Sequence, residues 1–267
     1  MEKETKRRLK VVSIVLVAMV AVIITIVLLT GNNDDGDFKD EELNMPYDYT
    51  YGKAMANNGM ELHYIRTKPS NITLEPIFNN VTVAPFYGIN GGFFYQNALL
   101  SIAVVNDEPV SKEKGSYGTG AVNAKYARGT LVWDESLDVL SVQVVSKPSD
   151  LAVTDRSRYW AQGGISMSLD RDADWLEQAM AEQVPLPNDY CLRSAAVYDT
   201  EGNLYLVVST IKGTLASFRE AVVEQIGDGK LVNGIFLDGD GSSQLRSREA
   251  KLQGDGRMVV QMLRLLR

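Results

Sequence analysis

The sequence is almost without histidine and cysteine, and this limits the chemistry available to it. Its 267 residues include one histidine, His63, and one cysteine, Cys191. A single cysteine rules out a disulfide within the chain, and the same counts exclude zinc sites built on several histidines or cysteines. A serine–histidine triad would require His63, which lies in an alternating apolar segment with no nucleophile motif nearby. Catalysis must therefore rest on carboxylates, arginine, asparagine and hydroxyl groups.

Positive charge is scarce beyond the N-terminus. The chain has 27 Lys and Arg against 34 Asp and Glu, a net charge of −7. The first thirty residues hold five bases and two acids, a net +3, which leaves −10 for the rest. This charge argues against nucleic-acid binding, which needs a basic face. It would also repel an anionic polymer, except where a local cationic site overrides the net charge.

Residues 11–30 form the one long apolar run, with no charged side chain. A helix of that length is about 30 Å long and can cross the hydrocarbon core of a bilayer. Basic residues precede the run and acidic residues follow it, so we expect a cytoplasmic N-terminus. A cleaved signal peptide is the alternative, but the run is longer than the usual signal core and no A-x-A site follows. The expected organisation is a tail (1–10), a transmembrane helix (11–30), an acidic stalk and strap (31–60) and a domain (61–267).

Short apolar segments separated by turn residues predict a β-rich domain. Two segments have a helical period, 172–182 and 214–226, and Thr214 is the expected N-cap of the second. A strand pair, the second helix and a strand at 234–237 predict a β–α–β layer. The predicted fold class is α+β, a mixed, β-rich sheet with few helices, preceded by one transmembrane helix. Strands are expected over 61–66, 71–78, 81–87, 99–105, 129–133, 139–145, 165–169, 193–198 and 204–209.

Two glycine-rich stretches place polar groups directly beside apolar, strand-like residues. Residues 88–95 read GINGGFFY, and residues 237–244 read LDGDGSSQ. Glycine lets a ligand approach the main chain closely. A carboxylate at the end of a buried strand, followed by bare amides and hydroxyls, suits an anionic or sugar ligand. The alternative is two β-turns with solvated Asn and Asp side chains.

The second stretch also partly matches a calcium-binding loop. Asp238, Asp240, Ser242 and Glu249 fall at positions 1, 3, 5 and 12 of an EF-hand, but Ser243 replaces the glycine required at position 6. This mismatch disfavours an EF-hand. No cofactor is expected, and a divalent cation near Asp238 and Asp240 stays open.

Taken together, the motifs resemble the phosphodiester glycosidase family. That family has an Asn-Gly-Gly-aromatic-Phe element, a Gly-Gly segment, an Arg-Thr/Ser-Ala element, an LDGGGS element and an Arg-Pro-Val ending, in this order. The clearest departure is Asp240, where the family has glycine. The corresponding segments here are 90–94 (NGGFF), 161–165 (AQGGI), 193–195 (RSA), 237–242 (LDGDGS) and 257–259 (RMV).

The resemblance implies a hydrolase that cleaves a sugar from a sugar-1-phosphodiester in a cell-surface glycan or polymer. The glycosidic bond breaks through an oxocarbenium-like state, which a carboxylate stabilises as nucleophile or by activating water. We assign that carboxylate to Asp238, the positioning of sugar hydroxyls or water to Asn90, and the binding of the departing phosphate to Arg193. The expected substrate-binding residues are Gly91, Gly92, Gly164, Asp240, Ser242, Ser243 and Arg257.

Two other classes of function stay open. A non-catalytic glycan-binding domain is supported by Asp240, because a second negative charge beside Asp238 could repel a phosphate. Asp240 could equally raise the pKa of one carboxylate and create a general acid. A structural surface protein would use the glycine motifs only as turns. The sequence leaves the sugar, its anomer, the polymer and the oligomeric state undetermined.

The expected topology gives the first prediction. Protease added to intact cells should digest the C-terminal domain, because the cationic flank of the apolar run places the N-terminus inside. Immunoblotting against the C-terminus measures this. A domain that is protected until the membrane is permeabilised would contradict the topology.

Overall fold

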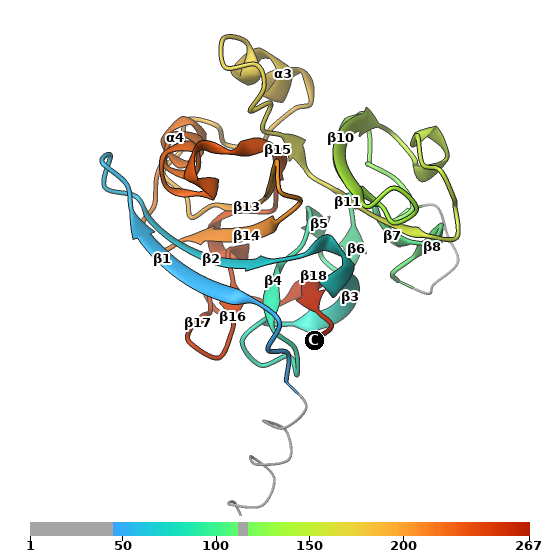
Figure 1. Ribbon diagram of the computed structural model, residues 1–267, viewed down its shortest axis with the longest axis horizontal. Coiled ribbons are helices and arrows are strands. Elements are labelled where there is room, and N and C mark those ends of the chain that lie inside the picture. The colour runs from blue at the N-terminus through green and yellow to red at the C-terminus, as the bar shows by residue number, and fades with distance from the viewer. Residues whose placement is uncertain (1–44, 112–116) are drawn as a thin grey trace, which may run out of the picture. The chain divides into compact units, whose positions relative to one another are not determined.

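The computed structural model describes residues 45–111 and 117–267 (Figure 1). The expected cytoplasmic tail, transmembrane helix and most of the acidic stalk lie outside these residues. In the described ranges, no helix is long and apolar enough to cross a membrane. A compact unit runs from Pro46 to Arg267, so the domain begins before residue 61. The strap expected ahead of it contributes the first strand.

The largest sheet has six strands and carries the main hydrophobic core. All of its hydrogen-bonded neighbours are antiparallel. Every residue of its two central strands, β14 and β13, is buried, which explains their nearly continuous apolar sequence. The strand order is β1 (Thr50–Met55), β2 (Glu61–Thr67), β14 (Leu204–Ser209), β13 (Ser194–Asp199), β15 (Leu231–Phe236) and β12 (Ile165–Ser166).

Helix α4 (Leu215–Gln225) covers one face of this sheet. Its N-terminus is capped as predicted, since the Thr214 side chain accepts a hydrogen bond from the N–H of Ser217. Its buried residues, such as Phe218 and Val222, pack in one cluster with Phe236 of β15. β14 and β15 flank β13 and are therefore parallel to each other, so the predicted β–α–β layer is present.

Two five-stranded sheets and a small hairpin complete the unit (Figure 1). A short helix, α3 (Trp175–Ala181), lies within the predicted segment 172–182. Short 3₁₀ turns occur at Pro69–Asn71, Pro148–Asp150, Gly227–Gly229 and Asp240–Ser242.

The first five-stranded sheet has the order β10 (Val139–Val145), β9 (Arg128–Asp134), β11 (Tyr159–Gly163), β7 (Ala103–Val105) and β8 (Glu108–Pro109). The second has the order β17 (Lys251–Leu252), β16 (Leu245–Arg246), β4 (Gly88–Asn90), β18 (Val259–Leu265) and β3 (Ile72–Asn79); the hairpin is β5 (Phe94–Tyr95) and β6 (Ala98–Leu99).

The structure corrects the sequence-based fold in three respects. The strands form four antiparallel sheets rather than one mixed sheet. The strand expected at 81–87 is a series of turns, because the Asn80 side chain accepts hydrogen bonds from the N–H and hydroxyl of Thr82. The segments 99–105 and 165–169 form only short strands, while β11 and β18 were not predicted.

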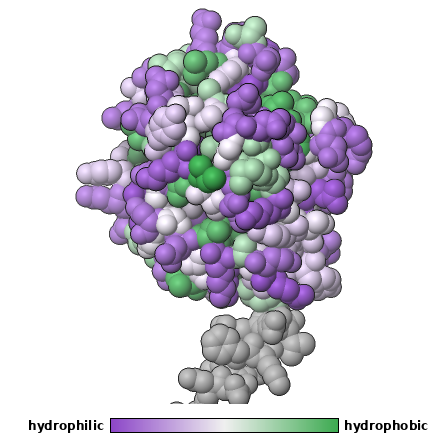
Figure 2. All heavy atoms as spheres, turned by 90° about the vertical axis from the view of Figure 1, so that its left-hand side faces the viewer, coloured by the Kyte–Doolittle hydropathy of each residue, from purple (hydrophilic) through white to green (hydrophobic). Residues whose placement is uncertain are grey.

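The face of the unit shown in Figure 2, the left-hand side of Figure 1, is mostly hydrophilic. Hydrophobic side chains appear there only in small separate groups. Scattered exposed apolar residues of this kind are normal for a protein surface. This face therefore has no extended hydrophobic patch.

Candidate active site

The ends of β4 and β15 bring the two glycine-rich stretches side by side. The N–H of Leu237 donates to Ser194 O at 2.9 Å, and the N–H of Asp238 donates to Gly91 O at 3.2 Å. The Asn90 side chain donates to Asp238 O at 2.8 Å. Asp238 therefore follows a buried strand of the main sheet and lies against the Asn-Gly-Gly segment of another sheet.

Asn90 is 1% exposed, and its side-chain amide is fully engaged within the protein. Besides the bond to Asp238 O, its Nδ2 lies 3.3 Å from Gly91 O. Its Oδ1 accepts hydrogen bonds from Ser194 Oγ at 2.9 Å and from the N–H of Gln244 at 3.1 Å. These contacts fix the backbone of the site, and a contact of Asn90 with a sugar or water stays a prediction.

The Asp238 carboxyl has a strongly shifted pKa. Desolvation raises the pKa of Asp238 to about 6. The Ser242 hydroxyl, the positive charge of Arg257 and the N–H of Gly239 each favour the carboxylate and limit the rise, while the charge of Asp240 adds to it. A partly buried carboxyl that titrates near neutral pH is characteristic of acid–base and nucleophilic sites.

Asp240 begins a 3₁₀ turn, Asp240–Ser242, with a backbone φ of 52°. This left-handed conformation favours glycine, and Asp tolerates it better than most residues. This backbone conformation explains how aspartate can occupy a position at which the family that the motifs resemble has glycine. The Asp240 side chain is about half exposed, and its Oδ2 lies 3.7 Å from Arg257 Nη2.

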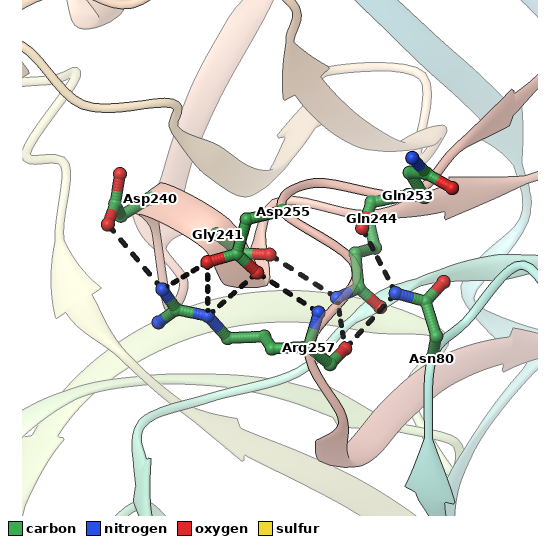
Figure 3. Close-up of polar contacts among 7 residues, drawn as sticks. All are labelled: Asn80, Asp240, Gly241, Gln244, Gln253, Asp255 and Arg257. Carbon is green, nitrogen blue, oxygen red and sulfur yellow. Dashed lines mark hydrogen bonds and ion pairs between the residues drawn. The ribbon is translucent and has the colours of Figure 1, made fainter.

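Figure 3 shows Arg257 between the Asp240 and Asp255 carboxylates. Its Nη2 donates to Asp255 Oδ2 at 2.5 Å, and its backbone N–H donates to Asp255 Oδ1 at 3.0 Å. The Gln244 side chain donates to Arg257 O at 2.9 Å and ties this turn to the glycine-rich loop. A Cβ at Gly241 would meet the side chains of Asp255 and Arg257, which would have to move to make room for it.

The hydroxyls of Ser242 and Ser243 are buried and make no hydrogen bond of standard geometry to any described residue. Ser242 is nevertheless close enough to Asp238 to lower its pKa. The backbone N–H groups of Asp240, Ser242 and Ser243 are used within the protein, by Leu192 O, Gly239 O and Asp240 O. Hydroxyl groups are therefore available as donors of this loop, while three of the amides expected from the sequence are occupied within the protein. Buried polar atoms without a partner mark places where a ligand or water can bind.

Arg193 is a buried cation that pairs with no carboxylate of the described chain. Its Nη2 donates to Leu186 O at 2.7 Å and to Asp189 O at 2.8 Å, and its Nε donates to Gly213 O at 3.3 Å. Burial lowers the pKa of this guanidinium. Carbonyl groups thus occupy three of its five N–H donors, and both N–H groups of Nη1 have no partner among the described residues.

The remaining predicted positions, Gly91, Gly92 and Gly164, are tight contacts within the protein. A Cβ on Gly91 would meet Gln261 Oε1, one on Gly92 would meet Gly163 O, and one on Gly164 would meet Phe236 O. The N–H of Gly91 already donates to Gln261 O at 2.9 Å. These buried glycines let strands approach one another, and their contact with a substrate stays a prediction.

Two glutamines beside these glycines were not predicted. Gln162 of β11 and Gln261 of β18 are fully buried, and the side-chain oxygen of each lacks a hydrogen-bond partner within the described chain. Gln261 lies against Gly91, and Gln162 lies against Gly92. Their only sequence signal is a glutamine within a strongly apolar segment, YWAQG and VVQML.

The site is not a recognisable metal centre. Among the described residues, no group of three or more His, Cys, Asp and Glu side chains could hold a metal ion. The segment that partly matches an EF-hand, residues 238–249, follows strand β15. It contains strand β16 and so is not a continuous loop. Glu249, at its last position, accepts a hydrogen bond from Tyr49 at 3.0 Å. The calcium-loop interpretation does not fit this geometry.

The fold is shared with a glycosidase catalytic domain. No protein-family model matches the chain, and no curated protein matches it. Among solved structures, it is similar to the catalytic domain of zebrafish N-acetylglucosamine-1-phosphodiester alpha-N-acetylglucosaminidase, auto-inhibited by its pro-peptide. The TM-score is 0.55 with 15% identity, over 82% of each chain. A hypothetical protein from Synechocystis also matches, with a TM-score of 0.44 and 12% identity, over 81% of this chain and 61% of that one.

The raised pKa of Asp238 predicts how its replacement alters stability with pH. A carboxyl whose pKa rises on folding binds more protons in the folded state, so stability falls as pH rises from about 3.8 to about 6. Asp238→Asn removes the ionisable carboxyl and with it this loss of stability. We expect the melting temperature of the variant to exceed the wild-type value by about 5 °C at neutral pH, and by little near pH 4.

Thermal melts of the full-length proteins across this pH range measure the difference. Because an Asn–Gly sequence can deamidate to aspartate, Asp238→Ala serves as a second variant. A difference that does not depend on pH would show that the Asp238 carboxyl does not titrate in this window.

Proposed function

We propose that this protein is an extracytoplasmic, membrane-anchored hydrolase that cleaves a sugar from a sugar-1-phosphodiester in a cell-surface glycan or polymer. The observation that carries the proposal is the partly buried Asp238 carboxyl, with a pKa of about 6, at the end of β15. It is supported by the shared fold of a catalytic domain that acts on a sugar-1-phosphodiester. The membrane anchor rests on residues 11–30, which lie outside the described chain.

In this proposal Asp238 is the nucleophile or the base that activates water. Its pKa leaves it mostly ionised at neutral pH but basic enough to accept a proton. As the glycosidic bond breaks, positive charge develops on the sugar, and a carboxylate placed next to it lowers the energy of that state. Asn90 holds the backbone of Asp238 in position and acts as a positioning residue.

The leaving phosphate monoester is already a stable anion, so the protein needs positive charge and donors rather than a strong acid. Arg193 has two N–H groups on Nη1 without a partner among the described residues and makes no direct ion pair there, although Asp189 and Asp240 act on its charge. The Ser242 hydroxyl beside Asp238 and the buried Ser243 hydroxyl of the same loop add donors. Arg257 contributes charge through the solvent-exposed side of the loop, although two carboxylates share it.

The direct test is turnover of a panel of nucleotide sugars and sugar-1-phosphodiesters by the full-length protein. We expect release of a reducing sugar, with an acidic limb near pH 6 in the pH profile of kcat/KM, because Asp238 must be ionised. Asp238→Asn should lower turnover at least about a hundred-fold, the usual scale for a positioned acid–base group. Thermal melts establish that the variant is folded.

Arg193→Lys is the matched test of the phosphate contact. It keeps the charge but loses the planar fork, so turnover should fall. Unlike a purely catalytic residue, Arg193 also binds three carbonyls, so the variant should melt at a lower temperature as well. If wild-type protein retains glycans but releases no sugar from any substrate, the non-catalytic binding domain replaces this proposal.

Asp240→Gly tests whether the departure from the family pattern matters for activity. Glycine adopts a φ of 52° without strain, so stability should change by less than about 1 kcal/mol. Removing a carboxylate near the candidate phosphate site should keep or increase kcat/KM. Asp240→Ala is the control for backbone strain and should melt at a lower temperature than Asp240→Gly. Loss of activity in both variants would instead give Asp240 an acid role.

A further inference from the structure

A large groove, of about 1010 Å³, lies apart from the residues of the candidate active site. It is bounded by the end of β3, the hairpin of β5 and β6, and residues 110–111 and 117–119. Three exposed aromatic side chains line it: Phe78, 43% exposed, and Tyr95 and Tyr117, each 65% exposed. Clustered exposed rings are costly in water and mark binding surfaces more often than isolated ones do.

The backbone turns one of these rings outward. The pairing of β18 with β3 contains a β-bulge, because Val259 pairs with Asn79 while Gln261 pairs with Pro76. This β-bulge gives Phe78 a φ of 44°, an unusual conformation for a bulky residue. Bulges re-aim a side chain. The exposed ring of Phe78 is therefore a feature of the strand geometry and not of a loose end.

Polar groups lie beside these rings in the same groove. Gln96 and Asn97 form the exposed turn between β5 and β6, and Ser111 adds a hydroxyl. A sugar ring has an apolar C–H face that packs on an aromatic ring and hydroxyls around its edge that pair with amides. Among the described residues that line the groove, Glu75 is the one acid, and its Oε2 accepts a hydrogen bond from Arg264 at 2.9 Å. Its charge is thus compensated.

A second cavity of about 460 Å³ adjoins the first, since Tyr117 lines both. It is lined by two exposed lysines, Lys125 and Lys147. Lys125 has no ion-pair partner among the described residues, and Lys147 lies 3.9 Å from Asp150, a weak and exposed contact. A pair of available cations in an otherwise acidic domain provides the local site that an anionic chain requires.

We propose that these adjoining cavities, the aromatic groove and the lysine cavity, form an exosite for an anionic glycan, a chain in which sugars alternate with phosphates. Sugar rings pack on Phe78, Tyr95 and Tyr117, and phosphates contact Lys125 and Lys147. The exosite deepens the proposed hydrolase function, on which it rests, by naming the class of substrate: a sugar–phosphate polymer that is held outside the residues performing the cleavage.

Binding is tested by calorimetry with full-length Asp238→Asn protein, which avoids turnover of the probe. The probes are a synthetic oligo(glucose-1-phosphate), neutral maltohexaose and inorganic polyphosphate. We expect the sugar–phosphate oligomer to bind at least about tenfold more tightly than either control, with an affinity that falls as salt rises. If polyphosphate bound as tightly as the oligomer, and if replacing the aromatic rings left this binding unchanged, the site would be a simple cation patch and the proposal would be overturned.

Variants separate the two parts of the exosite. Tyr95→Ala and Phe78→Ala should each weaken both the oligomer and maltohexaose about tenfold, whereas Tyr95→Trp should retain binding. The double variant Lys125→Gln with Lys147→Gln should weaken only the oligomer and remove its salt dependence. Tyr47→Ala and Lys230→Gln, an exposed tyrosine and an exposed lysine outside both cavities, are the matched controls. Unchanged binding in every exosite variant would overturn the proposal.

A small substrate distinguishes failure of the exosite from failure of the proposed function. With Asp238 intact, the exosite variants should hydrolyse a methyl sugar-1-phosphodiester as the wild type does and lose rate only on the polymer. If wild type hydrolyses neither substrate, the hydrolase function fails while calorimetry still decides the exosite. If wild type hydrolyses both substrates and the exosite variants hydrolyse the polymer at the wild-type rate, only the exosite inference is contradicted.

Discussion

The contacts of the Asn90 side chain hold the candidate site together. This buried amide connects the end of β4 to Asp238 O, to Ser194 Oγ at the start of β13, and to the N–H of Gln244. Three segments far apart in the sequence are thereby fixed around one side chain. Leaving any of these buried groups unpaired would cost about 1–3 kcal/mol each. The position of Asp238 is therefore determined by Asn90 as much as by its own strand.

The electrostatic state of Asp238 follows from that placement. Because its backbone is fixed at the end of a buried strand, its carboxyl is partly withdrawn from water, and this raises its pKa to about 6. The charge of Arg257 and the hydroxyl of Ser242 keep the rise moderate. At neutral pH the Asp238 carboxyl is therefore mostly ionised. It is nevertheless a stronger base than a carboxylate whose pKa an ion pair has lowered.

Much of this arrangement was predictable where the signal is local. The Thr214 cap, the apolar period of α4 and the glycine-rich stretches are properties of a few neighbouring residues, and the structure contains all three. The turns at 81–87 were not predicted, because an Asn side chain overrode a sequence typical of a strand. The antiparallel sheet arrangement and the burial of Gln162 and Gln261 depend on residues distant in sequence. Local patterns carry no information about such contacts.

Net charge alone gives a misleading picture of what this domain can bind. The chain is acidic overall, yet its charges are not distributed evenly. Arg257 is shared between Asp240 and Asp255 and is locally neutralised. Arg193 has only carbonyl partners and remains a net cation in a buried position. Since a buried charge interacts more strongly than an exposed one, this single arginine can outweigh several surface carboxylates at short range. An acidic domain can thus attract anions only where its cations are not neutralised, at the buried Arg193 and at exposed lysines without a strong ion pair, while the rest of its surface repels them.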